Sequence, residues 1–319
     1  MKTPSVGGSR QTTLGDFGIV FYKRRLNVDA MKATFRAGCA FAACLLGASS
    51  TEASSGAGVV VAWGDNCCGQ TNASPDLTNV IAIASGVHHS LALKLDGTVV
   101  AWGGNEFGQT KVPTGLPKVL AIACGGYYSI ALTHDGKVVA WGRNFSGQTN
   151  VPAELTNVVA VAGGNEHALA LKGDTTVVAW GYNLFGQANV PAGLTNIISI
   201  AGGAEHSLAL KGDGTVVAWG LNAYGQTNIP IGLTNVIAIT SGGEHSLALT
   251  SDGTVVAWGF NHLDQTNVPA GLTNAVAIAS GDGHSLALKA DGAVATWGGN
   301  SSSLTNVPAG LSNVIVCMI

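Results

Sequence analysis

Tryptophan recurs in this chain every 39 residues without drift, and no tryptophan lies outside that period. Each one stands in a copy of the segment TVVAWG, seen in full at residues 98–103, and each is followed by glycine. The seven positions are Trp63, Trp102, Trp141, Trp180, Trp219, Trp258 and Trp297. A fixed period of this length indicates a repeat protein, whose units each form one small supersecondary structure and bury their apolar faces against their neighbours.

One unit, residues 197–235, reads as short strands joined by turns. The run IISIA is apolar and β-branched, HSLALK alternates with period two, DG is a hairpin signal, and TVVAWG is rich in β-formers. The segment GQTNIP is short, polar and ended by proline, which predicts an edge strand. No run has the period or length of a helix. Each unit is therefore expected to be an antiparallel sheet of up to four strands, A to D.

One such sheet cannot bury both of its faces, whereas sheets arranged radially cover each other and leave only short edges. Seven C–D units but only six A–B units can be counted. We therefore predict an all-β fold, a seven-bladed β-propeller over residues 54–319 whose last blade is closed by both termini. Strand B of that blade is missing unless the polar residues 50–57 take its place, so the blade is predicted to be incomplete.

Two repeated residue types are assigned to structure. The tryptophan that ends each strand C is expected to be a wedge between sheets, because large rings dominate buried cores. Five histidines share one repeat position, where the sixth copy has Tyr128. They are His89, His167, His206, His245 and His284. Neighbouring blades would hold them too far apart to share one metal ion, so we expect hydrogen bonds that brace loops.

The first 53 residues differ from the repeats. MKATFR at 31–36 is basic, and AGCAFAACLLGA at 37–48 is an uncharged apolar run of 12 residues followed by small residues. This is the layout of a secretory signal peptide, and the run is too short to span a membrane. We predict an unstructured or mis-assigned start at 1–30, a signal peptide at 31–53, and an extracellular or periplasmic protein. A disordered tail is the alternative.

The six cysteines show neither a disulfide framework nor the spacing of metal ligands, although Cys67 and Cys68 are adjacent. His88, beside His89, is the one histidine considered as a metal ligand. The pairs of glutamate and histidine are neighbours on a strand, so their side chains point to opposite faces and form no dyad. The sequence therefore predicts no metal, no cofactor and no enzymatic activity.

The pattern HSLALKxDGTVVAWGxNxxGQ resembles the repeat of the regulator of chromosome condensation family. The resemblance covers about residues 59–319 and recurs six to seven times, which makes it specific for fold. It implies a seven-bladed propeller that serves as a binding scaffold. The units are short and similar to the compact bacterial form of the repeat, of which an exported protein inhibits beta-lactamases. The eukaryotic form implies nucleotide exchange on a GTPase, which an export signal disfavours.

Loops A–B and C–D of such blades lie on one face of the propeller, and all eight Phe and Tyr after residue 53 fall in them. The same loops carry seven acids, Asp65, Glu106, Glu166, Glu205, Glu244, Asp264 and Asp282, but one base, Arg143. Aromatic residues among acids on a rigid scaffold are typical of a protein-binding surface. The predicted binding residues are Phe107, Tyr127, Tyr128, Phe145, Glu166, Tyr182, Phe185, Glu205, Tyr224, Glu244 and Phe260.

Three of these residues, Phe107, Phe185 and Tyr224, share one position before GQ, so packing beneath their loops is the alternative for them. The predicted partner is a protein with a basic or amphipathic patch, bound by a monomer. Nucleic acid is excluded because residues after 53 hold eight Lys and Arg against 15 Asp and Glu. Beta-lactamase inhibition and carbohydrate binding are the alternatives, which inhibition assays and glycan arrays would separate. Nucleotide exchange is the least favoured function.

Overall fold

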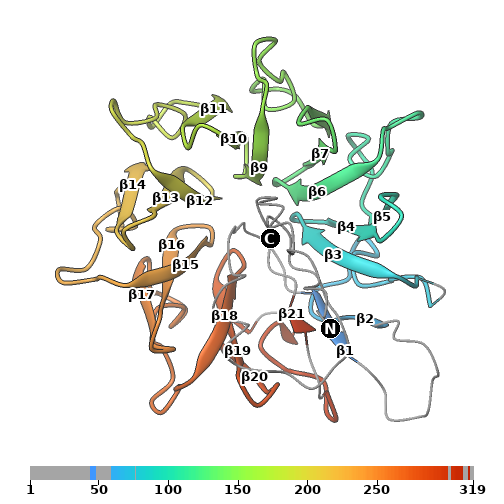
Figure 1. The fold of residues 1–319 in the computed structure, drawn as a ribbon. Helices are drawn as coiled ribbons and strands as arrows, with labels where there is room; N and C mark the ends of the chain where they lie inside the picture. Colours follow the sequence, from blue (N-terminus) through green and yellow to red (C-terminus); the bar gives the residue numbers. More distant parts are fainter. Residues whose placement is uncertain (1–43, 48–58, 76, 301–302, 312–314, 317–319) are drawn as a thin grey trace, which may run out of the picture.

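The computed structural model describes residues 44–47, 59–75, 77–300, 303–311 and 315–316. Within them every regular element but a single-residue turn of 3-10 helix is a β-strand, and no helix is long and apolar enough to span a membrane. Figure 1 shows the sheets arranged radially, with the first strand of each repeat nearest to the centre. The predicted all-β propeller architecture is confirmed for this part of the chain.

Six sheets each consist of three consecutive antiparallel strands that correspond to the predicted strands A, B and C. Their bounds are β3 Val80–Ser85, β4 His89–Lys94 and β5 Val99–Gly103; β6 Val119–Cys124, β7 Tyr128–Thr133 and β8 Val138–Gly142; β9 Val158–Gly163, β10 His167–Lys172 and β11 Val177–Gly181; β12 Ile197–Gly202, β13 His206–Lys211 and β14 Val216–Gly220; β15 Val236–Ser241, β16 His245–Thr250 and β17 Val255–Gly259; β18 Ala275–Ser280, β19 His284–Lys289 and β20 Val294–Gly298.

A seventh sheet joins the two ends of the chain, in the order β2 (Val59–Ala62), β1 (Cys44–Gly47), β21 (Ile315–Val316). Its middle strand was predicted to be missing, and this is wrong for the backbone, because β1 pairs with both neighbours. β1 lies within the range predicted as a signal peptide, and residues 50–57 lie outside the described residues. The predicted seven-bladed propeller is confirmed only in part: the described residues form six complete blades, and the sheet at the ends of the chain is smaller, since β21 has only two residues.

The predicted fourth strand does not form in the described repeats, because its polar side chains bond locally. In the unit of Trp219, Asn222 Oδ1 accepts the Thr227 amide at 3.1 Å, and Asn222 Nδ2 donates to Asn228 Oδ1 at 2.8 Å. Gln226 Oε1 accepts the Tyr224 amide at 2.9 Å. The segment is therefore a series of turns, in which side chains satisfy the backbone groups that a ladder would otherwise pair.

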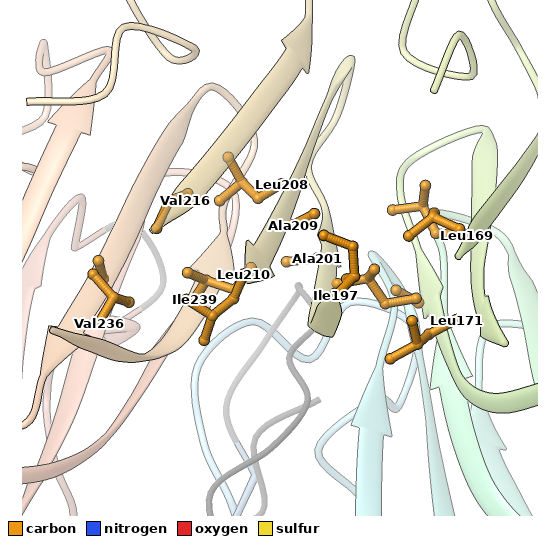
Figure 2. Packing of buried hydrophobic residues seen from close by; sticks show 14 of the residues in the cluster. Leu169, Leu171, Ile197, Ala201, Leu208, Ala209, Leu210, Val216, Val236 and Ile239 are labelled. Atoms are coloured by element: carbon orange, nitrogen blue, oxygen red, sulfur yellow. The ribbon is translucent and has the colours of Figure 1, made fainter. Parts of the chain in front are cut away.

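The tryptophans confirm the prediction of a wedge between sheets. Trp219 is buried in the largest hydrophobic cluster. This cluster contains residues from neighbouring sheets, for example Leu169, Leu208 and Ile239 (Figure 2). The Trp219 indole Nε1 donates to the backbone oxygen of Gln187, 32 residues earlier, at 2.9 Å. Equivalent bonds recur from Trp102 to Trp297. Each ring thus contributes apolar burial and one hydrogen bond to the preceding repeat.

The shared histidines make the predicted structural hydrogen bonds, and these bonds link neighbouring blades rather than brace loops. His167 Nε2 lies 2.9 Å from Ser207 Oγ of the next sheet, and Ser207 Oγ donates to Gln187 O at 2.9 Å. Since the serine hydrogen points to the carbonyl, the imidazole must donate from Nε2, which fixes the tautomer. The same pair recurs for His89, His206 and His245. Histidine, serine, glutamine and tryptophan thus form one interblade latch.

Close packing around the latch explains the glycine before each histidine loop. A Cβ added at Gly203 would lie 2.3 Å from His206 Cε1, so no larger residue fits beside that ring. Asn196 and its repeats, by contrast, adopt positive φ at the end of the preceding turn, which asparagine tolerates.

The latch has one exchanged copy. Tyr128 occupies the histidine position and Ala168, 40 residues later, occupies the place of its serine partner. Both residues are fully buried in one cluster, and Tyr128 donates its hydroxyl to the His167 backbone oxygen. The larger tyrosine in place of histidine is thus accompanied by the smaller alanine in place of serine. The tyrosine hydroxyl bonds to a backbone oxygen instead of a serine. The two changes belong to one volume-compensated exchange.

We expect Tyr128→His to destabilise the protein by about 1–3 kcal/mol, because the new imidazole lacks its serine. Ala168→Ser alone is expected to be destabilising because its hydroxyl crowds the tyrosine ring. The double variant restores the latch. Its loss in free energy of unfolding, measured in urea, should therefore be smaller than the sum of the two single losses by about 0.5–3 kcal/mol. Additive losses would show that the two positions are not coupled.

Candidate functional site

The loops that follow strands A and C converge on one face, as predicted, because aromatic rings from both kinds of loop are in contact. Tyr127, between β6 and β7, lies edge-on to Phe107, after β5, with ring centroids 5.5 Å apart. Phe107 also meets Phe145, after β8, at 5.8 Å. Rings at these separations in T-shaped geometry stabilise each other beyond their buried area. Three predicted binding residues from two neighbouring blades are therefore one group.

Arg143 lies at the centre of this group. Its guanidinium carbon is 5.0 Å from the Phe145 ring centroid, 5.6 Å from that of Phe107 and 5.7 Å from that of Tyr127. All three separations are within the range of cation–π attraction. We name Phe107, Tyr127, Arg143, Phe145 and Glu166 the Arg143 cluster. The only base predicted on this face is thus enclosed by three rings.

Glu166 neutralises that base. Arg143 Nη1 donates to Glu166 Oε1 at 2.9 Å, and both side chains are mostly buried, with 25% and 20% exposed. The second carboxylate oxygen accepts the Ser146 hydroxyl at 2.8 Å. A shielded, charge-assisted pair of this kind fixes the side chains around it. The cluster therefore presents rings to the surroundings, and Phe145 is 77% exposed.

Further aromatic contacts lie farther along the ring of blades, in two separate places. Tyr182 meets Phe185 with centroids 6.2 Å apart, and Tyr224 meets Phe260 at 4.7 Å. Phe185 and Tyr224 are 39% and 48% exposed, so they do not pack beneath their loops as the alternative interpretation held. Phe260 also contacts His262 at 5.1 Å. Each set of rings thus offers half-exposed apolar area that can be buried against a partner.

Tyr128 is a correction to the predicted binding residues. Its side chain is fully buried and it begins strand β7, one residue beyond the loop that carries Tyr127. A residue without exposed surface cannot contact a partner at this face. The sequence placed Tyr128 in the loop because the boundary between loop and strand cannot be predicted to within one residue.

The acids of the predicted site lie at equivalent repeat positions and influence each other. Burial raises the pKa of the Glu205 carboxyl, and the charge of Glu166 raises it further. Burial also raises the pKa of Glu244, with smaller contributions from the charges of Asp282 and Glu205. Burial is thus the main cause of both raised pKa values, and repulsion between neighbouring carboxylates adds to it.

The prediction from aromatic residues missed two exposed leucines. Leu184 is 73% exposed and stands at the repeat position of Phe145, whereas Leu263 is 51% exposed and stands at that of Tyr224. Repeat position was the signal that could have found them, because equivalent residues of equivalent loops reach the same part of the face. Both are therefore expected to add apolar area to this face.

The fold is shared with solved structures of low sequence identity. Prp20p from Saccharomyces cerevisiae, whose structure was described with its binding to Gsp1p and histones, is 20% identical, with 81% of this chain and 85% of that chain covered and a TM-score of 0.66. The ectodomain of the Arabidopsis thaliana receptor kinase ACR4 is 20% identical, with 79% and 90% covered and a TM-score of 0.60. Human WBSCR16 is 21% identical, with 79% and 86% covered and a TM-score of 0.60.

No curated protein sequence matches the chain. The family model described as the Regulator of chromosome condensation (RCC1) repeat matches six segments, which together form more than half of the chain. They are residues 80–109, 119–148, 158–187, 197–226, 236–265 and 275–303. Each segment runs from the start of a strand A into the loop after strand C. It therefore contains the strands, the tryptophan and the histidine position of one repeat. The chain therefore belongs to the RCC1-repeat family.

Proposed function

We propose that this protein is a non-enzymatic, exported binding module that uses the face of the Arg143 cluster to hold a protein with a basic or amphipathic patch. The observation that carries the proposal is the enclosed Arg143, whose charge is neutralised by Glu166 while Phe145 stays exposed. Rings held rigidly on a scaffold lose little conformational freedom when they bind, which is typical of hot-spot residues.

Charge supports the basic character of the partner. The raised pKa values of Glu205 and Glu244 reflect burial first and, to a smaller degree, repulsion from neighbouring carboxylates in the free protein. A cationic side chain between them would remove that repulsion and pull both pKa values down. Binding should therefore weaken at higher ionic strength, because the attraction of partly exposed charges is screened by salt.

The architecture proposed for this module is a propeller of seven blades, the last of them closed by both termini. Support comes from the bond that Trp63 Nε1, just after β2, donates to Leu304 O at 3.0 Å, since it joins the first repeat to the last without the predicted signal peptide. The ring would hold the loops of all blades in fixed positions on one face. A single monomer would then present the complete binding surface.

The test compares three immobilised forms of the full chain, exposed to soluble proteins of the source cell: the natural protein, Phe145→Ala/Tyr224→Ala, and the control Leu95→Ala. Leu95 is 62% exposed in a hairpin after β4, on the face opposite to the cluster. A partner should be retained by the natural protein and the control. Its Kd for the double variant should rise at least tenfold, which corresponds to about 1.4 kcal/mol.

Equal capture by all three forms would overturn the assignment of the face. Inhibition of a beta-lactamase that disappears in the double variant would identify the partner as that class of protein. Binding on a glycan array that disappears in the same variant would assign the rings to sugar stacking and would overturn the proposal of a protein partner.

A further inference from the structure

Two cysteines and a histidine from different loops meet at the edge of the same face. Cys67 and Cys68 follow β2, and His88 lies in the loop between β3 and β4. Cys67 Sγ is 3.3 Å from Cys68 Sγ and 3.7 Å from His88 Nδ1. The three ligand atoms all lie within 4.8 Å of one another. The sequence predicted no metal site, because these residues have no ligand spacing along the chain.

Local hydrogen bonds hold the cysteine loop in the form that brings both thiols together. The Cys67 amide donates to Asp65 Oδ1 at 3.2 Å, and the Cys68 amide donates to Gln70 Oε1 at 2.9 Å. Gln70 Nε2 in turn donates to Asp65 Oδ2 at 3.2 Å. The two acceptor side chains therefore support each other, and the loop does not depend on an ion for its shape.

The neighbouring blade has to come close for His88 to reach the thiols. A Cβ added at Gly104 would lie 3.1 Å from the His88 backbone oxygen and 3.5 Å from Cys68 Cβ, so glycine leaves the space that this approach needs. The His88 ring also packs edge-on to Tyr127, with centroids 5.5 Å apart, which fixes its direction. Both sides of the site are thus held by contacts outside it.

We propose that Cys67, Cys68 and His88 bind one thiophilic metal ion, Zn²⁺ or Cu⁺, through two thiolates and the imidazole Nδ1. Soft sulfur and imidazole ligands select these ions over Mg²⁺ and Ca²⁺, which take oxygen ligands. A tetrahedral ion about 2.3 Å from two sulfurs separates them by about 3.8 Å, so small side-chain rotations suffice. Three protein ligands leave one coordination position open for water or another ligand.

The ion would add a link between two blades that Trp102 and Ser90 already join through their bonds to Gln70 O. The cysteine loop follows the short sheet that contains β2, whereas His88 belongs to the first complete blade. Because His88 contacts Tyr127, and Tyr127 contacts Phe107 and Arg143, the bound ion also fixes one side of the Arg143 cluster. Metal binding is therefore expected to stabilise the fold by mass action, since the ligands converge only in the native structure.

The experiment uses the reduced full chain, stripped of metal by a chelator under anaerobic conditions. Zn²⁺ and Cu⁺ are titrated in competition with a chromophoric chelator, and Co²⁺ serves as an optical probe of thiolate coordination. The variants are Cys67→Ser, Cys68→Ser and His88→Asn. The matched control is His262→Asn, because His262 is exposed in a loop of the same face and contacts only Phe260 among the rings of the described residues.

One equivalent of metal should bind the natural protein and His262→Asn, with a thiolate–cobalt absorption and a raised Tm. Loss of a residue that only supports a metal ligand typically weakens metal binding roughly 10–100-fold. Each ligand variant should therefore lose at least that much affinity. Circular dichroism of the metal-free variants shows whether they fold. A stoichiometric site that survives Cys67→Ser/Cys68→Ser would contradict the proposal. So would a reduced natural protein that binds no more metal than Cys67→Ser/Cys68→Ser does.

Discussion

Acidification from pH 7 to about pH 5 is expected to lower the free energy of unfolding by several kcal/mol, because five buried histidines must stay neutral in the fold. Burial lowers the pKa of His89, His167 and His284 to about 4, and that of His206 and His245 to about 3, from 6.5. At pH values between the folded and the unfolded pKa, the unfolded chain binds protons that the folded chain cannot.

The sign follows from the depressed folded pKa. Above about pH 6.5 the histidines are neutral in both states and their contribution is complete. As the pH falls, each one favours the unfolded state by up to about 1.4 kcal/mol per pH unit, until the folded pKa near 3–4 is reached. Protonation would also put a hydrogen on Nδ1 of residues such as His167 and His206, where this buried nitrogen has no hydrogen-bond partner, and a charge into the latch, with no carboxylate among its described partners.

Urea unfolding of the full chain at several pH values between 7 and 5 measures this slope. The hairpin aspartates do not interfere, because Asp135 and Asp174 have their pKa lowered to about 2 from 3.8, so their contribution is lost only below that window. In the variant His206→Asn, the free energy of unfolding should depend less steeply on pH, by the uptake of one proton, whatever the stability of the variant at pH 7. A free energy of unfolding that is constant from pH 7 to 5 would show that the latch histidines titrate normally.

Trp219→Ala is expected to cost about 3–5 kcal/mol, the range for loss of a large buried ring. The substitution removes the wedge of the largest hydrophobic cluster and the bond from Nε1 to Gln187 O. Trp219→Phe keeps an aromatic ring and should cost less than half as much. The Gln187 oxygen then still accepts the Ser207 hydroxyl, so no buried carbonyl is left without a donor.

Equilibrium unfolding in urea at pH 7 gives both values, and the exposed Leu95→Ala serves as the neutral control. If the phenylalanine variant lost as much as the alanine variant, the indole hydrogen bond would carry the stabilisation, and the wedge interpretation of the repeated tryptophan would be wrong. The repeat also predicts similar losses at Trp180 and Trp258, which are equally buried.

The period of 39 residues determined the most about this protein. Strands A, B and C, their order and the burial of tryptophan could all be predicted, because hydrophobic alternation and hairpin signals act over a few residues and then repeat. Strand D could not. Its asparagine and glutamine side chains compete with the ladder for the same backbone groups, and only the positions of all the partners decide that competition.

The candidate face was predicted in part for the same reason. Loop residues such as Phe145 and Tyr224 could be placed on it from strand order alone. The neutralisation of Arg143 by Glu166 could not be predicted, because the two lie in different blades. Nor could the single residue that separates exposed Tyr127 from buried Tyr128.

Contacts between loops were decided only by the tertiary structure. Cys67 and His88 are 21 residues apart and have no motif in common, yet their ligand atoms meet because two sheets pack side by side. The sequence alone thus determined the repeat, the blade and the face that carries varied residues. The packing of one blade on the next determined which side chains share a site, because distances between blades depend on sheet geometry and not on spacing along the chain.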